Sequence, residues 1–296
     1  MKLAIYGREF QDSVIQYVQE LFDLIAQEHI EIWVYYLFND FLEDKIEYKQ
    51  TTYSFVSYED LPKDIKFMLS LGGDGTMLAA VSIIADSGIP VTGINFGRLG
   101  FLASINKDKI KEAFGALLAG NYDIEQRVLL STYTENGGTP NEGEVSFALN
   151  DITIVKKDSS AMITVNAYVN NELLNAYWAD GLIVATPTGS TAYSLSCGGP
   201  IVMPGSGNFI ITPISPHNLN VRPIVVTDSS VIRIEIESRS DSFLFSCDSN
   251  TRVINTGAII NIKRANFTVN LIRLKHESFF STLRHKLLWG LDTRNY

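Results

Sequence analysis

The fold is decided by residues 66–76, which read KFMLSLGGDGT. Its first six residues, 66–71, are mostly apolar and have the length and composition of a buried β-strand. Two glycines, Gly72 and Gly73, end this run, and helical periodicity follows from Met77 to Ser87. A strand, a glycine turn and a helix in this order are typical of an α/β sheet, in which ligands bind at the carboxyl ends of the strands.

The rest of the first half alternates in the same way. Strands are predicted at residues 3–6, 31–38 and 90–95, and apolar side chains recur at helical spacing over residues 10–26. Alternating strands and helices predict a parallel sheet covered by helices.

After about residue 125 short β-rich segments dominate. Val231–Glu237 alternates apolar and polar residues, as a strand with one solvent-exposed face does. The predicted strands are 147–155, 162–169, 182–186, 222–227, 231–237 and 267–274. We therefore expect an α/β domain over residues 1–125 and a β-rich, sandwich-like domain over residues 126–277. The tail, residues 278–296, returns to a helical pattern with Leu283, Leu287 and Leu288 on one face, and is expected to join the first domain.

Composition excludes several classes of protein. The chain has 296 residues, of which 46% are hydrophobic and 19% charged, so it can bury a core. A net charge of −9 argues against nucleic-acid binding, and no apolar run approaches the roughly 18 residues of a membrane span. Charge at Arg8 and Glu9 precedes any signal-peptide core, and the two cysteines, Cys197 and Cys247, fit a reducing compartment. We expect a cytoplasmic protein that binds neither nucleic acid nor membrane.

The glycine turn is a candidate phosphate site. Its glycines let the backbone approach a phosphate, which an acidic protein must hold with backbone amides, helix N-termini or a metal ion. Asp74 lies at the rim, able to contact a hydroxyl or a cation. The alternative is a plain helix cap by Asp74 or Thr76. The spacing matches neither a Walker A loop nor a dinucleotide fingerprint. Arg98, further along, either approaches a phosphate or anchors its own loop.

A second polar segment follows another predicted strand. Residues 180–194 read DGLIVATPTGSTAYS, in which a strand ends in a dense cluster of hydroxyls. Hydroxyls and unpaired backbone N–H groups suit an anion or a nucleotide, and the ring of Tyr193 can stack on a base. The alternative is an ordinary turn capped by Ser190 or Thr191.

Together with Asn95–Leu102, these two segments resemble the NAD kinase family. Further matches occur in the family's order and extend the resemblance over about residues 66–250. They are Leu149–Asp151, Ser196–Pro200 and Ile214–Pro223. The Gly-Gly-Asp-Gly-Thr run alone is shared with lipid kinases and phosphofructokinases, whereas the combination is specific.

The resemblance implies transfer of the γ-phosphoryl group of ATP to the 2′-hydroxyl of the adenosine ribose of NAD. It also implies a divalent cation, Mg²⁺ being the expected one, and a homo-oligomer, either a dimer or a tetramer. Mg²⁺ bridging the phosphates would neutralise charge that an acidic protein cannot. Phosphoryl transfer otherwise needs mainly alignment of the reactants.

The resemblance also implies residue roles. Asp74 would accept the hydroxyl proton, and the backbone of Gly75 would contact NAD beside it. Asn150 and Asp151 would hold the adenosine. Asp180 and Asn250 would contact the dinucleotide from the β-rich domain, with the site between the domains, and so would Thr191, Ala192, Tyr193, Ser194, Leu195 and Ser196. Phosphate contacts are expected from Gly72, Gly73, Thr76 and Arg98.

Three positions depart from the family pattern. Asp151 stands where a glutamate is common, and Asn250 replaces a glutamine. Trp178 stands where a basic or small residue is common, which leaves the preference between NAD and NADH open. Two other functions stay open from the residues: a diacylglycerol-type lipid kinase, which needs a wide apolar cavity, and a non-catalytic NADP sensor, which has no need of Asp74.

Overall fold

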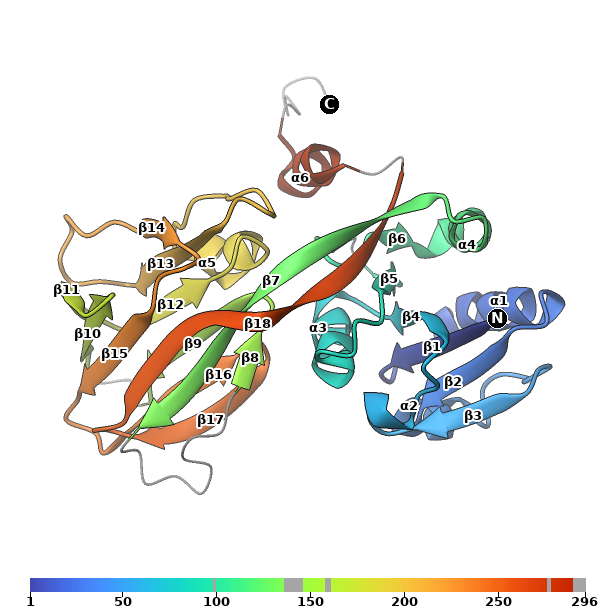
Figure 1. Ribbon diagram of the computed structural model, residues 1–296, viewed down its shortest axis with the longest axis horizontal. Helices are drawn as coiled ribbons and strands as arrows, with labels where there is room; N and C mark the ends of the chain where they lie inside the picture. The colour runs from blue at the N-terminus through green and yellow to red at the C-terminus, as the bar shows by residue number, and fades with distance from the viewer. Residues whose placement is uncertain (98–99, 136–145, 158–160, 276–277, 290–296) are drawn as a thin grey trace. The chain divides into compact units, whose positions relative to one another are not determined.

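The computed structural model describes residues 1–97, 100–135, 146–157, 161–275 and 278–289 (Figure 1). The chain divides into two compact units. The first comprises Met1–Gln126 with Val269–Tyr296, and the second comprises Arg127–Thr268. Two long strands, β7 (Tyr122–Glu135) and β18 (Ile259–Leu274), contribute residues to both units.

The first unit is built on a parallel sheet in the order β3-β2-β1-β4-β5, with β6 beside β5. Leu271 of β18 pairs with Val91 of β5. Chain order reverses between β1 and β4, and such a reversal is where open α/β sheets bind ligands. The strands are β1 Lys2–Gly7, β2 Glu31–Tyr35, β3 Thr52–Phe55, β4 Ile65–Leu71, β5 Val91–Asn95 and β6 Ile105–Asn106.

Helices alternate with these strands, as the sequence predicts. α1 buries Val18, Leu21, Phe22 and Ile25, the positions whose spacing indicated it. The strand predicted over 31–38 is wrong at its end, because residues 36–38 begin α2, which buries Phe38 and Leu42 four residues apart. The helices are α1 Ile15–Gln27, α2 Tyr36–Leu42, α3 Asp74–Ile84, α4 Ile110–Leu118 and α6 Phe279–Leu287, with 3₁₀ turns η1 Asp12–Val14, η2 Tyr58–Asp60 and η3 Lys107–Lys109.

The second unit contains two antiparallel sheets whose inner faces share one core. One sheet runs β11-β10-β15-β18, and the other runs β14-β13-β12-β9-β16-β17. The strand predicted over 147–155 is interrupted at Leu149–Asn150, so that β8 and β9 are separate. The elements are β8 Ser146–Ala148, β9 Asp151–Lys156, β10 Ile163–Val169, β11 Glu172–Ala179, β12 Gly181–Ala185, η4 Gly189–Thr191, α5 Tyr193–Ser196, β13 Asn208–Ile214, β14 Ile224–Thr227, β15 Ile232–Glu237, β16 Ser242–Cys247 and β17 Asn250–Asn255.

The C-terminal helix α6 begins with a capping box between Ser278 and Ser281. Leu283 is buried, but Leu288 is 63% exposed and ends the helix with φ 56°. The prediction that Leu288 shares the buried face with Leu283 is therefore wrong, because a left-handed residue leaves the helical spacing. None of the helices in the described ranges has both the length and the apolar character that crossing a bilayer requires.

Candidate active site

The glycine turn follows β4 at the point where the chain order of the sheet reverses. Gly72 has φ +149°, and a Cβ there would overlap the side chain of Thr76, so only glycine suits the position. Gly73 and Gly75 differ from it, because a Cβ on either would meet no protein atom within 4 Å. The turn therefore leaves open space around two of its glycines.

Asp74 is the first residue of α3, and its carboxylate binds a second loop. Oδ2 accepts the backbone N–H of Phe101 at 2.8 Å, and Oδ1 accepts those of Leu102 and Ala103 at 3.1 and 2.9 Å. An ionised carboxylate offers about four acceptor positions, so one position on Oδ2 remains. Asp74 is thus held in one orientation and can still accept one further hydrogen bond.

Gly100 makes this orientation possible, and no local sequence pattern singles it out. A Cβ at Gly100 would overlap Oδ1 of Asp74. Its backbone N–H donates to Ala103 O at 3.2 Å, which closes the loop around the carboxylate. Arg98, the phosphate candidate from the same loop, lies outside the described residues.

The hydroxyl cluster after β12 mostly binds its own backbone. Thr186 Oγ1 donates to Leu149 O at 2.5 Å and accepts from Gly189 N. Ser190 Oγ donates to Pro187 O and accepts from Val202 N, and Arg127 donates to Thr188 Oγ1. These bonds fit an ordinary turn, but the predicted caps are wrong: the cap residues are Thr188 for η4 and Ala192 for α5, and neither makes a side-chain cap bond. The sequence did not indicate Arg127 as a partner of this segment.

The following residues, 191–196, were predicted to contact NAD. Ser194 is buried, and its hydroxyl pairs with that of Thr212 at 2.8 Å. Thr191 Oγ1 donates to Thr188 O, whereas Tyr193 is 44% exposed. Ala192 and Leu195 are half-buried, and Ser196 is exposed. The ring of Tyr193 is therefore accessible from solvent.

Asn150 and Asp151 lie where β8 gives way to β9. Oδ1 of Asn150 is buried and has no hydrogen-bond partner among the described residues. Asp151 is 7% exposed and accepts a hydrogen bond from Thr153 Oγ1 at 2.9 Å. Burial raises the pKa of Asp151 to about 6, opposed by the Thr153 bond and reinforced by the charge of Asp248. A buried acceptor without a donor is unusual and points to a ligand that supplies one.

Asp248 is the functional candidate that sequence reasoning missed. Its Oδ2 accepts the backbone N–H of Leu149 at 2.8 Å, and its Oδ1 accepts those of Asn150 and Asp151 at 2.8 and 3.1 Å. Its own N–H donates to Asp151 O, and its φ is 49°. Burial raises the pKa of Asp248, against the effect of the three backbone bonds. Asp248 thus holds the turn that presents Asn150.

Asp180, another predicted contact, forms an ion pair with Lys156 at 2.6 Å. Lys156 is the last residue of β9, and Asp180 directly precedes β12, the strand beside it in the sheet. Trp178 is 52% exposed, and its ring lies 4.2 Å from that of His217. Asn250 is exposed at the start of β17, opposite Cys247.

No three His, Cys, Asp or Glu side chains gather into a possible metal site within the described part of the chain. Mg²⁺ commonly keeps several waters and binds through substrate phosphates and one or two carboxylates. A cation that binds together with the phosphates of ATP therefore fits the residues present. Asp74 is the carboxylate that belongs to the glycine turn itself.

Two family models match the chain: the ATP-NAD kinase N-terminal domain over residues 3–122 and the ATP-NAD kinase C-terminal domain over residues 149–274. The chain is 44% identical to an NAD kinase of Cytophaga hutchinsonii and 42% identical to one of Flavobacterium psychrophilum, with 100% of each chain covered. It is 41% identical to an NAD kinase of Porphyromonas gingivalis over 99% of both chains.

Solved structures share the fold. Yeast NADH kinase complexed with NADH superposes with a TM-score of 0.88 at 22% identity, covering 100% of this chain and 89% of the other. An NAD kinase from Archaeoglobus fulgidus in complex with ATP gives 0.69 at 23% identity, covering 97% and 99%. Neither the lipid-kinase nor the sensor alternative is favoured by these relatives. The chain belongs to the ATP-NAD kinase family and is an ATP-dependent kinase that transfers the γ-phosphoryl group of ATP to NAD.

Proposed function

We propose that Asp74 orients the 2′-hydroxyl of the adenosine ribose and accepts its proton. The observation that carries this role is the remaining acceptor position on Oδ2, on a carboxylate that three backbone N–H groups hold in place. A carboxylate is a weak base toward a ribose hydroxyl, so it mainly aligns the oxygen and takes the proton late, as the new O–P bond forms.

The glycine turn supplies the phosphate contacts in this proposal. No side chain caps the N-terminus of α3, whose cap residue is Gly73. A helix N-terminus with unpaired amides attracts phosphate oxygens, and the open space at Gly73 and Gly75 lets them approach. Gly72 gives the turn its shape, and Thr76 packs against it. Arg98 is also proposed to contact a phosphate, on the basis of the sequence alone.

Asn150 and Asp151 are proposed to hold the adenosine. The buried Oδ1 of Asn150 would accept the exocyclic amine of adenine, which is the donor that this atom lacks. Asp151 stands next in the chain and would accept from the ribose or the base. Asp180, Asn250 and the segment 191–196 are proposed to contact the remainder of NAD, with Tyr193 as its stacking surface.

We propose three further properties. Mg²⁺, when bound to the ATP phosphates, would neutralise the charge that develops on the transferred phosphoryl group. Activity should therefore disappear on chelation and return on addition of Mg²⁺. A homo-oligomeric assembly is proposed, for which light scattering gives the number of subunits. A cytoplasmic location is proposed on the two cysteines, both of which are free thiols.

The adenosine assignment is tested with Asn150→Ala and its matched control Asn255→Ala, which truncates an exposed amide at the end of β17. Calorimetric titration with AMP isolates the adenosine half of the dinucleotide. Loss of a buried hydrogen bond of about 1–1.5 kcal/mol predicts roughly five- to tenfold weaker AMP binding by Asn150→Ala only. Equal AMP affinities of the two variants would remove Asn150 from the site.

A further inference from the structure

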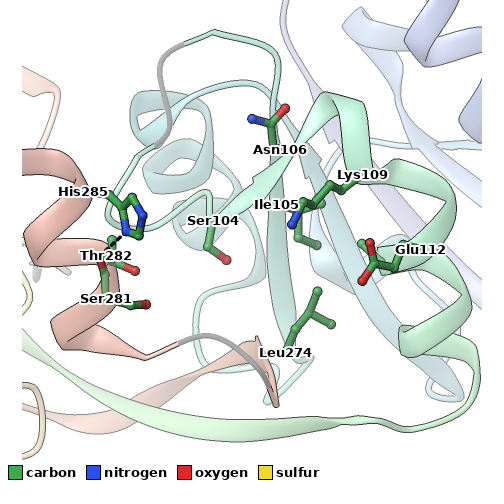
Figure 2. A pocket seen from close by; sticks show the side chains of 10 residues that line it. Ser104, Ile105, Asn106, Lys109, Glu112, Leu274, Ser281, Thr282 and His285 are labelled. Carbon is green, nitrogen blue, oxygen red and sulfur yellow. Dashed lines mark hydrogen bonds between the residues drawn. The ribbon is translucent and has the colours of Figure 1, made fainter. Parts of the chain in front are cut away.

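A cavity of about 280 Å³ lies in the first unit between α6 and the segment from β6 to α4 (Figure 2). Its volume is close to the lower end of small-molecule pockets, which measure roughly 300–1,000 Å³. The proposed roles of Asp74 and the glycine turn use none of its lining residues. They are Ser104, Ile105, Asn106, Lys109, Glu112, Ala113, Leu274, Ser281, Thr282 and His285.

The cavity combines an apolar floor with a polar wall. Ile105, Ala113 and Leu274 are 2%, 3% and 3% exposed and form the apolar part. In Figure 2 the polar side chains of α6 lie on one side of the cavity, and Lys109 extends toward them from the other. A ligand that fits must therefore have an apolar body and a polar end.

Two of the polar groups, those of Lys109 and Asn106, offer N–H donors to a ligand. The ammonium group of Lys109 forms no hydrogen bond or ion pair with any residue in the described ranges, and it is exposed to solvent. Asn106 Oδ1 accepts from Asp108 N at 3.0 Å, which leaves its amide N–H groups for a ligand. Thr282 and Ser104 add hydroxyls. An ammonium group without a partner, beside amide N–H groups, favours an anionic ligand group.

His285 and Glu112 restrict the chemistry of the ligand further. His285 Nδ1 donates to the backbone oxygen of Ser281 at 2.7 Å, so its Nε2 faces no partner within the described chain. Glu112 is the one carboxylate of the lining and can accept a hydrogen bond from a ligand hydroxyl or ammonium group.

We propose that this cavity is an effector site for a small organic carboxylate that has an apolar body and a second, hydrogen-bond-donating group. The carboxylate lies against Lys109 and Asn106, the apolar body covers Ile105, Ala113 and Leu274, and the donor lies against Glu112. At about ten non-hydrogen atoms, such a ligand is much smaller than either substrate, so ATP and NAD do not fit this cavity as whole molecules.

The site is coupled to Asp74 through adjacent residues of one loop. Ala103 N–H donates to Asp74 Oδ1 at 2.9 Å, and the next residue, Ser104, lines the cavity. A ligand that fills the cavity, of which Ser104 forms one wall and α6 another, stabilises the loop conformation in which residues 101–103 hold the Asp74 carboxylate, and it should raise kcat. This kinetic consequence rests on the proposed role of Asp74, whereas binding to the cavity does not.

The test uses the full chain and 3-hydroxybenzoate, a carboxylate with an apolar ring and a hydroxyl, as the probe. Lys109→Gln removes the unpaired charge of the cavity. Lys111→Gln makes the same change two residues later, at an exposed position of α4 outside the lining. Calorimetric titration should show millimolar or tighter binding by the wild type and Lys111→Gln, and at least about tenfold weaker binding by Lys109→Gln. The neutral 3-hydroxybenzyl alcohol should bind at least about tenfold more weakly than the acid.

Equal binding of the acid by the two variants, equal binding of the alcohol and the acid, or no binding at about 10 mM would overturn the site. Kinase assays at saturating probe then test the coupling. A rise in kcat of about twofold or more in the wild type and Lys111→Gln, absent from Lys109→Gln, is expected. Unchanged kcat in a protein that binds the probe would overturn the effector role alone, and basal kcat of both variants should equal that of the wild type.

Discussion

Two carboxylates of this chain have the same bonding pattern in different surroundings. Asp74 accepts the backbone N–H groups of three consecutive residues, 101–103, and Asp248 accepts those of residues 149–151. In both, one oxygen accepts two of these bonds and the other accepts one. Hydrogen bonding alone therefore does not distinguish a reacting carboxylate from a supporting one.

The surroundings distinguish them. Asp74 lies between two glycines at which an added Cβ would meet no protein atom within 4 Å, so a substrate has room to approach it. Asp248 lies in the turn between β16 and β17, beside the buried carboxylate of Asp151, and burial raises its pKa. The first carboxylate therefore belongs to a turn with open space on either side of it in the chain, whereas the second orders the loop that presents Asn150.

The largest effect is expected from Asp74→Asn. The amide loses the proton acceptor and turns an N–H group toward one of the three backbone donors, so kcat should fall by at least about 10²-fold. NAD affinity should stay within about threefold, because binding uses other residues. Steady-state kinetics and calorimetric titration measure the two effects separately.

Asp123→Asn, an exposed aspartate of the same unit, is the matched control and should keep wild-type kcat. A kcat of Asp74→Asn close to that of the control would show that Asp74 is a supporting residue like Asp248, and the functional distinction between the two carboxylates would disappear.

Asp151→Asn tests how much the buried charge beside Asp248 destabilises the fold. The pKa of Asp151 is about 6 in the folded chain, above its ordinary 3.8, so the buried charge lowers the free energy of unfolding as pH rises through this interval. Asparagine carries no such charge. The variant should therefore match the wild type below about pH 4 and be more stable above pH 6, by up to about 3 kcal/mol.

Urea unfolding at pH 4 and pH 7 measures this difference. Stability of Asp151→Asn that lies below the wild type at pH 7 would show that the ionised carboxylate is stabilised by its surroundings. The same variant should bind AMP more weakly, since it loses the proposed acceptor.

Gly100→Ala tests whether the orientation of Asp74 matters apart from its charge. A Cβ there overlaps Asp74 Oδ1, so the carboxylate must move while its chemistry is unchanged. Displacement of a reacting group by about 1 Å lowers rates by up to about 10²-fold, and we expect a decrease in kcat of about tenfold. Gly97→Ala is the matched control in the same loop, because a Cβ there lies 3.7 Å from its nearest neighbour.

Equal kcat values for Gly100→Ala and Gly97→Ala would show that turnover does not depend on the position in which the backbone of residues 101–103 holds the Asp74 carboxylate.

These variants also show what the sequence could and could not predict. The turn after β4 was predictable because an apolar strand, glycines and a helical pattern are adjacent in the chain. Asp248 was not, because its partner Leu149 lies 99 positions away and no local pattern joins them. The hydroxyls of residues 186–194 looked like ligand contacts, but composition does not show whether a hydroxyl binds a ligand or its own backbone. Gly100 was missed because its function depends on a side chain from another loop.

The smallest effect is expected from Asp248→Asn. The amide keeps one oxygen for two of the three backbone donors, and its N–H group faces the third, so the turn at residues 149–151 loosens. Because Asn150 depends on this turn, the KM for NAD should rise about five- to tenfold while kcat changes less than twofold. Removal of a charge beside Asp151 opposes the loss of the hydrogen bond, so the free energy of unfolding should change little at pH 7.

Asp241→Asn, which changes an exposed aspartate in the same unit, is the matched control and should leave the KM for NAD unaltered. A fall in kcat at constant KM would instead give Asp248 the role assigned to Asp74.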